Sequence, residues 1–85
     1  MTKAIQGGKG WPDLFIARSN AVYSGLFIEL KSEDTRLYKR DGSFTTPHIA
    51  EQFEMLRNLK DSGYIAKFAF GFDDAKEIID WYLNL

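Results

Sequence analysis

Residues 25–31 form an apolar run that constrains the fold of this chain more than any other feature of its sequence. The run reads Gly-Leu-Phe-Ile-Glu-Leu-Lys and has the length and residue types of a β-strand. Successive side chains of a strand point to opposite faces. One face therefore carries Leu26, Ile28 and Leu30, and the other carries Phe27, Glu29 and Lys31. The run predicts a mostly apolar strand with an acid and a base on one face, near its end.

Two other segments are predicted to be strands. Pro12 biases the preceding Trp11 toward an extended conformation, and the apolar residues that follow predict a strand over 13–17. The residues between this strand and the run at 25–31 predict a loop, so the two strands form a hairpin. A mostly apolar run over 64–72 is also of strand length.

Two helices are predicted in the second half of the chain. Thr46 is a suitable N-cap, Pro47 suits the first helical position, and Ser62-Gly63 can end the helix. A final helix is predicted to start at Asp74, because its spacing from Glu77 is typical of a helix start. The resulting order, β-β-α-β-α, predicts an α/β domain in which helices cover a small sheet and the central strands are buried.

The composition narrows the class of function. The chain has 85 residues, enough for one hydrophobic core and therefore for a single domain over 1–85. It has no cysteine, which excludes disulfides and thiolate metal sites and leaves carboxylates as ligands for a hard metal ion. No apolar run approaches the roughly 20 residues that span a bilayer, so we expect a cytoplasmic protein with no membrane partner.

The charge is small but unevenly placed. A net charge of −1 argues against a strongly basic nucleic-acid coat protein. Residues 1–46 hold seven Lys or Arg against five Asp or Glu, whereas residues 47–85 hold four against seven. A modest basic surface around an acidic site suits a nuclease.

A hairpin brings Asp13, Glu29 and Lys31 together. Two carboxylates that converge at the edge of a sheet repel one another unless a cation lies between them, so they are a natural site for Mg²⁺ or Mn²⁺. The lysine can then contact the scissile phosphate or the attacking water. Each part alone has a plainer explanation, because alternating charges usually mark a solvated strand face and Pro-Asp commonly forms a turn. Their combination on two apolar strands is more specific.

This combination resembles a known family. Residues 8–15 (Gly-Lys-Gly-Trp-Pro-Asp-Leu-Phe), residues 25–31 and Gln52 within a helix are similar to the virus-type replication-repair nuclease (VRR-NUC) domain of the PD-(D/E)xK superfamily. The resemblance covers residues 7–85. It implies a restriction-endonuclease-like core, with a small mixed sheet flanked by helices, and metal-dependent hydrolysis of DNA phosphodiester bonds.

The resemblance also assigns roles to residues. It implies that Asp13 and Glu29 bind Mg²⁺ or Mn²⁺, that the Leu30 backbone carbonyl assists, and that Lys31 is the catalytic lysine. Helical periodicity places Gln52 on an apolar helix face, where its amide needs partners. These partners are backbone groups or, as the resemblance implies, groups at the edge of the active site.

The sequence departs from the family pattern at its start. Nucleases of this type usually carry a further acidic residue on a helix well before the Pro-Asp, and no Asp or Glu precedes Asp13. Either the leading helix is short or absent, or the chain is a truncated form, or a second subunit completes the site. The main alternative to an active nuclease is a catalytically impaired nuclease-fold domain that binds DNA or a partner subunit. A third alternative is an interaction module whose motif residues are coincidental surface features.

DNA contacts are predicted around the motif. Residues 32–46 are polar and rich in turn formers, which predicts an exposed, mobile loop. Four basic residues are candidates for contact with the phosphates of DNA: Lys9, Arg36, Lys39 and Arg40. The alternative for these residues is that they are solvated at the surface. Trp11 is a candidate for stacking on a base, and its alternative is packing within the protein. His48 falls in a first helical turn, where an exposed or capping role is expected.

A homodimer acting on branched DNA is the expected working unit. Stand-alone phage and bacterial VRR-NUC proteins are similar to junction resolvases, which gives a Holliday junction as the expected substrate and a bacterial or phage-infected cell as the setting. A two-fold dimer matches the symmetry of a four-way junction. Without the leading helix, one side of the sheet is less well covered, which favours association. Phe72, Trp81 and Tyr82 are the candidates for this contact, with the core as their alternative.

Overall fold

The strand β2 (Leu26–Lys31) is the centre of a three-stranded sheet in the computed structural model, which describes residues 11–85. The strand β1 (Leu14–Ile16) pairs with it antiparallel on one side. The strand β3 (Ile65–Phe70) pairs with it parallel on the other side. The predicted hairpin and the predicted mixed sheet are therefore both confirmed.

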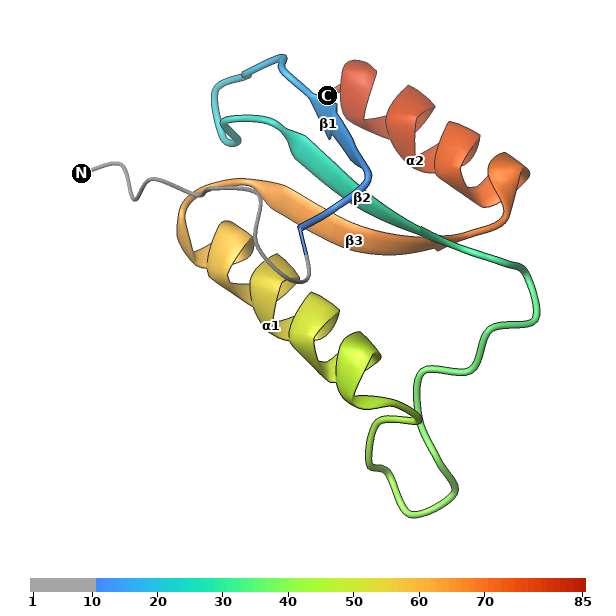
Figure 1. Ribbon diagram of the computed structural model, residues 1–85. Coiled ribbons are helices and arrows are strands. Elements are labelled where there is room, and N and C mark those ends of the chain that lie inside the picture. The colour runs from blue at the N-terminus through green and yellow to red at the C-terminus, as the bar shows by residue number, and fades with distance from the viewer. Residues whose placement is uncertain (1–10) are drawn as a thin grey trace.

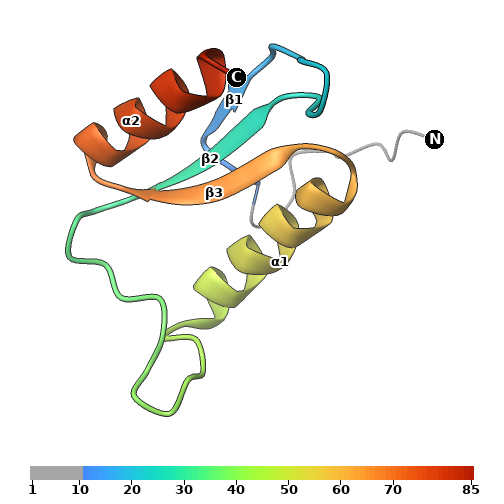
Figure 2. The same ribbon diagram turned by 180° about the vertical axis from the view of Figure 1, so that it is seen from behind.

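Two helices cover the two faces of this sheet (Figure 1). Helix α1 (Pro47–Asp61) lies against one face, and helix α2 (Phe72–Leu83) lies against the other. The view from behind shows the same sandwich of helix, sheet and helix (Figure 2). The order of elements is β-β-α-β-α, as predicted. Among residues 11–85, neither helix has the length and apolar character needed to cross a membrane.

The ends of α1 follow the local sequence signals. The Thr46 side chain accepts a hydrogen bond from the Ile49 N–H at 3.1 Å, and Pro47 occupies the first helical turn. The helix ends at Asp61 with Ser62 as its C-cap, and Gly63 follows with a φ of +98°, in the left-handed region that favours glycine. The helix predicted from Thr46 to Ser62-Gly63 is confirmed.

Helix α2 begins earlier than predicted. Its first residue is Phe72, because Gly71 adopts a φ of +89° and turns the chain sharply at the end of β3. Asp74 lies inside the first turn, where its carboxylate accepts a hydrogen bond from the Phe70 N–H at 2.8 Å. The acid therefore reaches back to the strand instead of starting the helix. The prediction that Asp74 begins the helix was wrong by two residues.

The core has two layers, one on each face of the sheet. The layer under α2 contains buried residues of both central strands and of the helix: Leu26, Ile28, Ile65, Ala69, Ala75, Ile78 and Tyr82. The layer under α1 contains Phe27, Leu56, Leu59 and Ala66. Because helices cover both faces, residues 26–29 of β2 are buried, and these include the acid that the strand carries, Glu29.

Tyr82 belongs to the α2 layer and not to an exposed surface. The residue is 2% exposed, and its hydroxyl donates a hydrogen bond to the Arg18 carbonyl. Its prediction as a subunit contact was therefore wrong, because the core takes it up. Phe72 and Trp81, the other two aromatic candidates, are 79% and 49% exposed.

The segment between β2 and α1 is a folded projection. Tyr38 and Phe44 form an antiparallel bridge, and their ring centroids lie 5.2 Å apart. At its tip the Asp41 carboxylate accepts hydrogen bonds from the hydroxyl and the N–H of Ser43, which lower the pKa of Asp41. Figure 1 shows this segment extending beyond the first turn of α1. The predicted exposure is confirmed, and the tip is a hydrogen-bonded turn.

Candidate active site

The register of the β1–β2 hairpin sets the site. Leu14 lies opposite Ile28, which brings Asp13, the residue before β1, level with Glu29. The residue before Asp13 is Pro12, whose ring restricts the backbone φ at this point. The Leu30 N–H donates a hydrogen bond to the Asp13 carboxylate at 2.9 Å. The side chain of Asp13 is therefore held against the backbone of β2, just before the first paired residue of β1.

The Leu30 carbonyl lies on the same side of β2 as Asp13. In a sheet, the N–H and C=O of one strand residue point toward the same neighbouring strand. The Leu30 N–H points to Asp13, so its carbonyl does as well. The Lys31 carbonyl faces the other way, because it accepts a hydrogen bond from the Gly71 N–H at 2.8 Å. The Leu30 carbonyl, which is predicted to assist a metal, therefore lies on the side of β2 that faces Asp13.

Glu29 is the buried acid of the site. It is 4% exposed, and its pKa is raised from 4.5 to about 7. The largest cause is desolvation by burial, followed by the hydrogen bond and the charge repulsion that Asp13 contributes. The charge of Lys31 opposes this shift. The three residues predicted to form the motif therefore interact directly or through their charges.

Two buried oxygens near this face have no hydrogen-bond donor. Within the described part of the chain, Glu29 Oε1 and Gln52 Oε1 are buried without a partner. Gln52 is 5% exposed and lies on the face of α1 that packs on the sheet. A buried carboxylate oxygen with no donor, beside a second carboxylate, has too little compensating positive charge, since Lys31 offsets the raised pKa of Glu29 only in part. These residues fit a divalent cation, which would supply that charge.

The protein supplies few ligands for such a cation. Among residues 11–85, no group of three or more His, Cys, Asp or Glu side chains converges. The side chains of Asp13 and Glu29, with the Leu30 carbonyl, make three oxygen donors. Mg²⁺ commonly keeps several waters and uses only one or two carboxylates in sites of this kind. The donor set is therefore small but chemically suitable.

The other predicted residues fall into two groups. Lys31 is half-buried and shares the face of β2 that carries Glu29, and Trp11 is half-buried with its ring edge-on to Phe27 at 5.5 Å. The exposed residues are Arg36, Lys39 and Arg40 in the projection and His48 in the first turn of α1. Most of the predicted DNA contacts therefore lie outside the two strands of the motif hairpin. Lys9 lies outside the described residues.

No family model and no curated protein matches the sequence. A solved structure described as a VRR_NUC domain protein matches with a TM-score of 0.72 and 35% sequence identity. The match covers 93% of this chain and 57% of that protein, so this chain spans little more than half of that protein's length. This chain is thus similar in both fold and sequence to a VRR_NUC domain protein, with a small mixed sheet flanked by two helices.

Proposed function

We propose that this domain is a divalent-metal-dependent DNA nuclease. The observation that carries the proposal is the buried Glu29, whose Oε1 has no donor and whose pKa is raised to about 7 beside Asp13. A carboxylate in this position is unfavourable without a cation. Asp13, Glu29 and the Leu30 carbonyl would hold Mg²⁺ or Mn²⁺. The likeness to a VRR_NUC domain protein supports the same function.

Each residue has a distinct part in the hydrolysis of a phosphodiester bond. When bound, the metal supplies a Lewis acid and lowers the pKa of a water molecule. Lys31 stabilises the negative charge that develops on the phosphate as the P–O bond breaks. The Gln52 amide, on the buried face of α1, orients a water molecule or a ligand. The reaction consumes one water molecule and gives a phosphomonoester and a free hydroxyl group.

The exposed basic residues are proposed to hold the DNA backbone. Arg36, Lys39 and Arg40 lie in the projection, whose Lys39 N–H donates to the Ser43 carbonyl at 2.7 Å and fixes the tip. Contacts of this kind position DNA without reading its sequence, and they weaken as salt increases. Trp11 and, from the sequence alone, Lys9 are proposed as further DNA contacts.

The test of this function is cleavage of linear, flap and four-way-junction DNA in Mn²⁺ or in EDTA. We expect cleavage in Mn²⁺ and none in EDTA, with the junction cut fastest. Salt-sensitive binding of the same DNAs without cleavage would support instead the catalytically impaired domain. That alternative has one observation in its favour, the absence of a third acidic side chain at the site among residues 11–85.

A homodimer is proposed as the working unit on branched DNA. The two exposed aromatic residues of α2, Phe72 and Trp81, are the candidates for the contact, since buried Tyr82 is excluded. A two-fold dimer would place two identical sites on a four-way junction. Light scattering over a concentration series should give twice the chain mass of 9.8 kDa. A mass near 9.8 kDa, with full cleavage activity at the same concentration, would contradict the dimer.

A further inference from the structure

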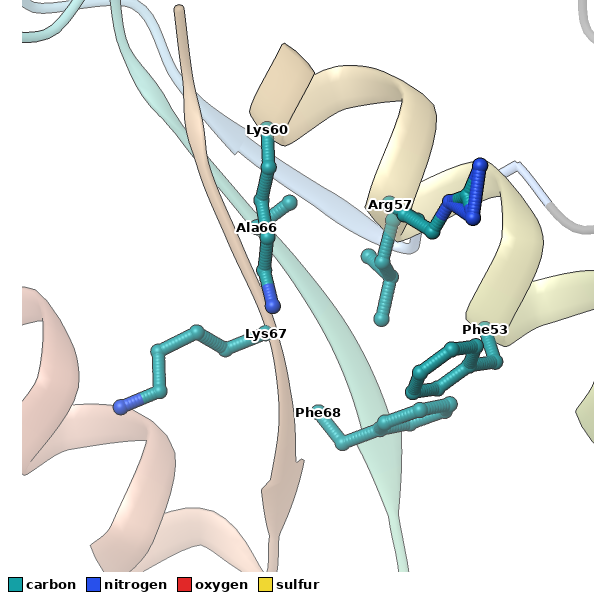
Figure 3. A pocket seen from close by; sticks show the side chains of 7 residues that line it. Phe53, Arg57, Lys60, Ala66, Lys67 and Phe68 are labelled. Atoms are coloured by element: carbon teal, nitrogen blue, oxygen red, sulfur yellow. The ribbon is translucent and has the colours of Figure 1, made fainter.

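A pocket of about 190 Å³ lies between α1 and β3, apart from the motif residues. Its apolar lining comes from Phe53, Leu56, Ala66 and Phe68, and its other residues are basic. Figure 3 shows the rings of Phe53 and Phe68 close together at one end of the pocket. A pocket of this size with flat aromatic walls suits a flat apolar group.

The aromatic wall continues beyond the pocket. The ring of Phe53 lies 5.0 Å from that of Phe44, which in turn lies 5.2 Å from that of Tyr38 in the projection. On the other side, the ring of Phe68 lies 6.3 Å from that of Phe70. Tyr38, at one end of this row of rings, is 47% exposed to solvent. The pocket is therefore part of an extended aromatic surface.

The charges around the pocket are basic. Arg57 and Lys60 of α1 line it, and Figure 3 shows Lys60 reaching across Ala66 while Lys67 points away toward α2. The ion pair of Arg57 with Glu54 is long, at 3.9 Å, and both side chains are more than half exposed. Within residues 11–85, Lys60 has no carboxylate within 4.0 Å. Two cations beside apolar rings complement an aromatic ligand that carries negative charge.

We propose that this pocket binds an unpaired nucleobase of a DNA strand, with Lys60 and Arg57 on its phosphates. Aromatic rings that stack on bases and cations that contact the backbone are the two features by which proteins bind single strands. A base paired within a duplex cannot enter such a pocket, because its faces are stacked on its neighbours. The ligand is thus a single-stranded segment, as at a branch point or a strand end.

The pocket and the candidate active site can serve one DNA strand. Phe68 is the register partner of Glu29 across β2 and β3, and neighbouring strands lie about 4.8 Å apart. Gln52 and Phe53 are adjacent on α1, with Gln52 on the buried face and Phe53 at the pocket. This inference rests on the proposed function only in taking DNA as the ligand, and its test requires no cleavage.

The test is binding of two labelled oligonucleotides of equal length in EDTA, measured by fluorescence anisotropy. One is an oligothymidylate, and the other has the same backbone with abasic sites throughout. We expect the wild-type protein to bind the oligothymidylate about tenfold more tightly, because only this oligonucleotide has bases that can stack on an aromatic ring. Phe53→Leu keeps an apolar side chain at this position and should lose most of that preference.

Lys60→Gln should weaken binding of both oligonucleotides and reduce the salt dependence, since a phosphate contact does not depend on the base. Lys76→Gln is the control, because Lys76 is also exposed, on α2, but lies outside the pocket. Equal binding of the two oligonucleotides by the wild-type protein would overturn the proposal, whether or not the variants fold. So would equal effects of the two lysine substitutions. Competition by an acidic peptide, with no base preference, would identify a peptide site instead.

The results separate this proposal from the nuclease function. Base-dependent binding without metal-dependent cleavage would support the pocket and contradict the nuclease. Cleavage without a base preference in binding would support the nuclease and contradict the pocket.

Discussion

Lys31→Ala should lower the rate of metal-dependent DNA cleavage by about 100- to 1000-fold, the loss typical when one electrostatic contact to a developing charge is removed. Mn²⁺ binding should be retained, because the lysine is assigned to the phosphate and not to the ion. Single-turnover cleavage rates at saturating Mn²⁺, with calorimetry on the same variant, measure both properties.

The pH of this comparison is important. Lys31 lowers the pKa of Glu29, so its removal should raise that pKa above its present value of about 7. The assay should therefore be run well above neutral pH, where Glu29 is ionised in both proteins. Lys76→Ala is the control for loss of an exposed lysine. Unchanged turnover in Lys31→Ala would remove the lysine from the mechanism, and a loss of Mn²⁺ binding under these conditions would assign it to the metal site.

Glu29→Gln should make the metal-free protein more stable than the wild type above neutral pH, while removing a proposed metal ligand. The folded pKa of Glu29 is raised from 4.5 to about 7. The stability that its protonated form contributes is therefore full below about 4.5 and is lost as the pH rises through about 7. The loss amounts to at most about 3 kcal/mol. An uncharged glutamine avoids it.

Urea unfolding in EDTA at several pH values measures this effect. The stability of the wild type should fall between acidic and weakly alkaline pH, and that of Glu29→Gln should fall less. Glu54→Gln, a substitution at an exposed position, should follow the wild-type profile. Added Mn²⁺ should stabilise the wild type but not Glu29→Gln. Parallel pH profiles for Glu29→Gln and the wild type would show that Glu29 is not perturbed in the metal-free protein.

The parts of the fold that were predictable depend on neighbouring residues in the sequence. Thr46, Pro47 and Ser62-Gly63 bound α1 through contacts within one helical turn, and their residue types signal those contacts. The start of α2 depends on more distant geometry. Gly71 turns the chain where β3 ends, and Asp74 bonds back to Phe70. The sequence does not indicate where β3 stops, because Phe72 is as apolar as the strand before it.

The candidate site shows the same division. Alternation along β2 predicts that Glu29 and Lys31 share a face. It does not predict that α1 buries Glu29, or that the Leu30 N–H bonds to Asp13, since both depend on pairings between distant segments. Tyr82 was misplaced for a related reason. A core and a subunit contact both bury aromatic side chains, so periodicity alone cannot tell them apart.

Binding of Mn²⁺ tests the central claim most directly, because the whole mechanism requires that Asp13 and Glu29 hold a divalent cation. Calorimetric titration should be carried out in the absence of DNA, well above neutral pH, on the wild type and on the double variant Asp13→Ala, Glu29→Ala. The proposed function predicts Mn²⁺ binding by the wild type and its loss in the double variant. Equally tight binding by both proteins would contradict it, because the ion would then be held by other residues.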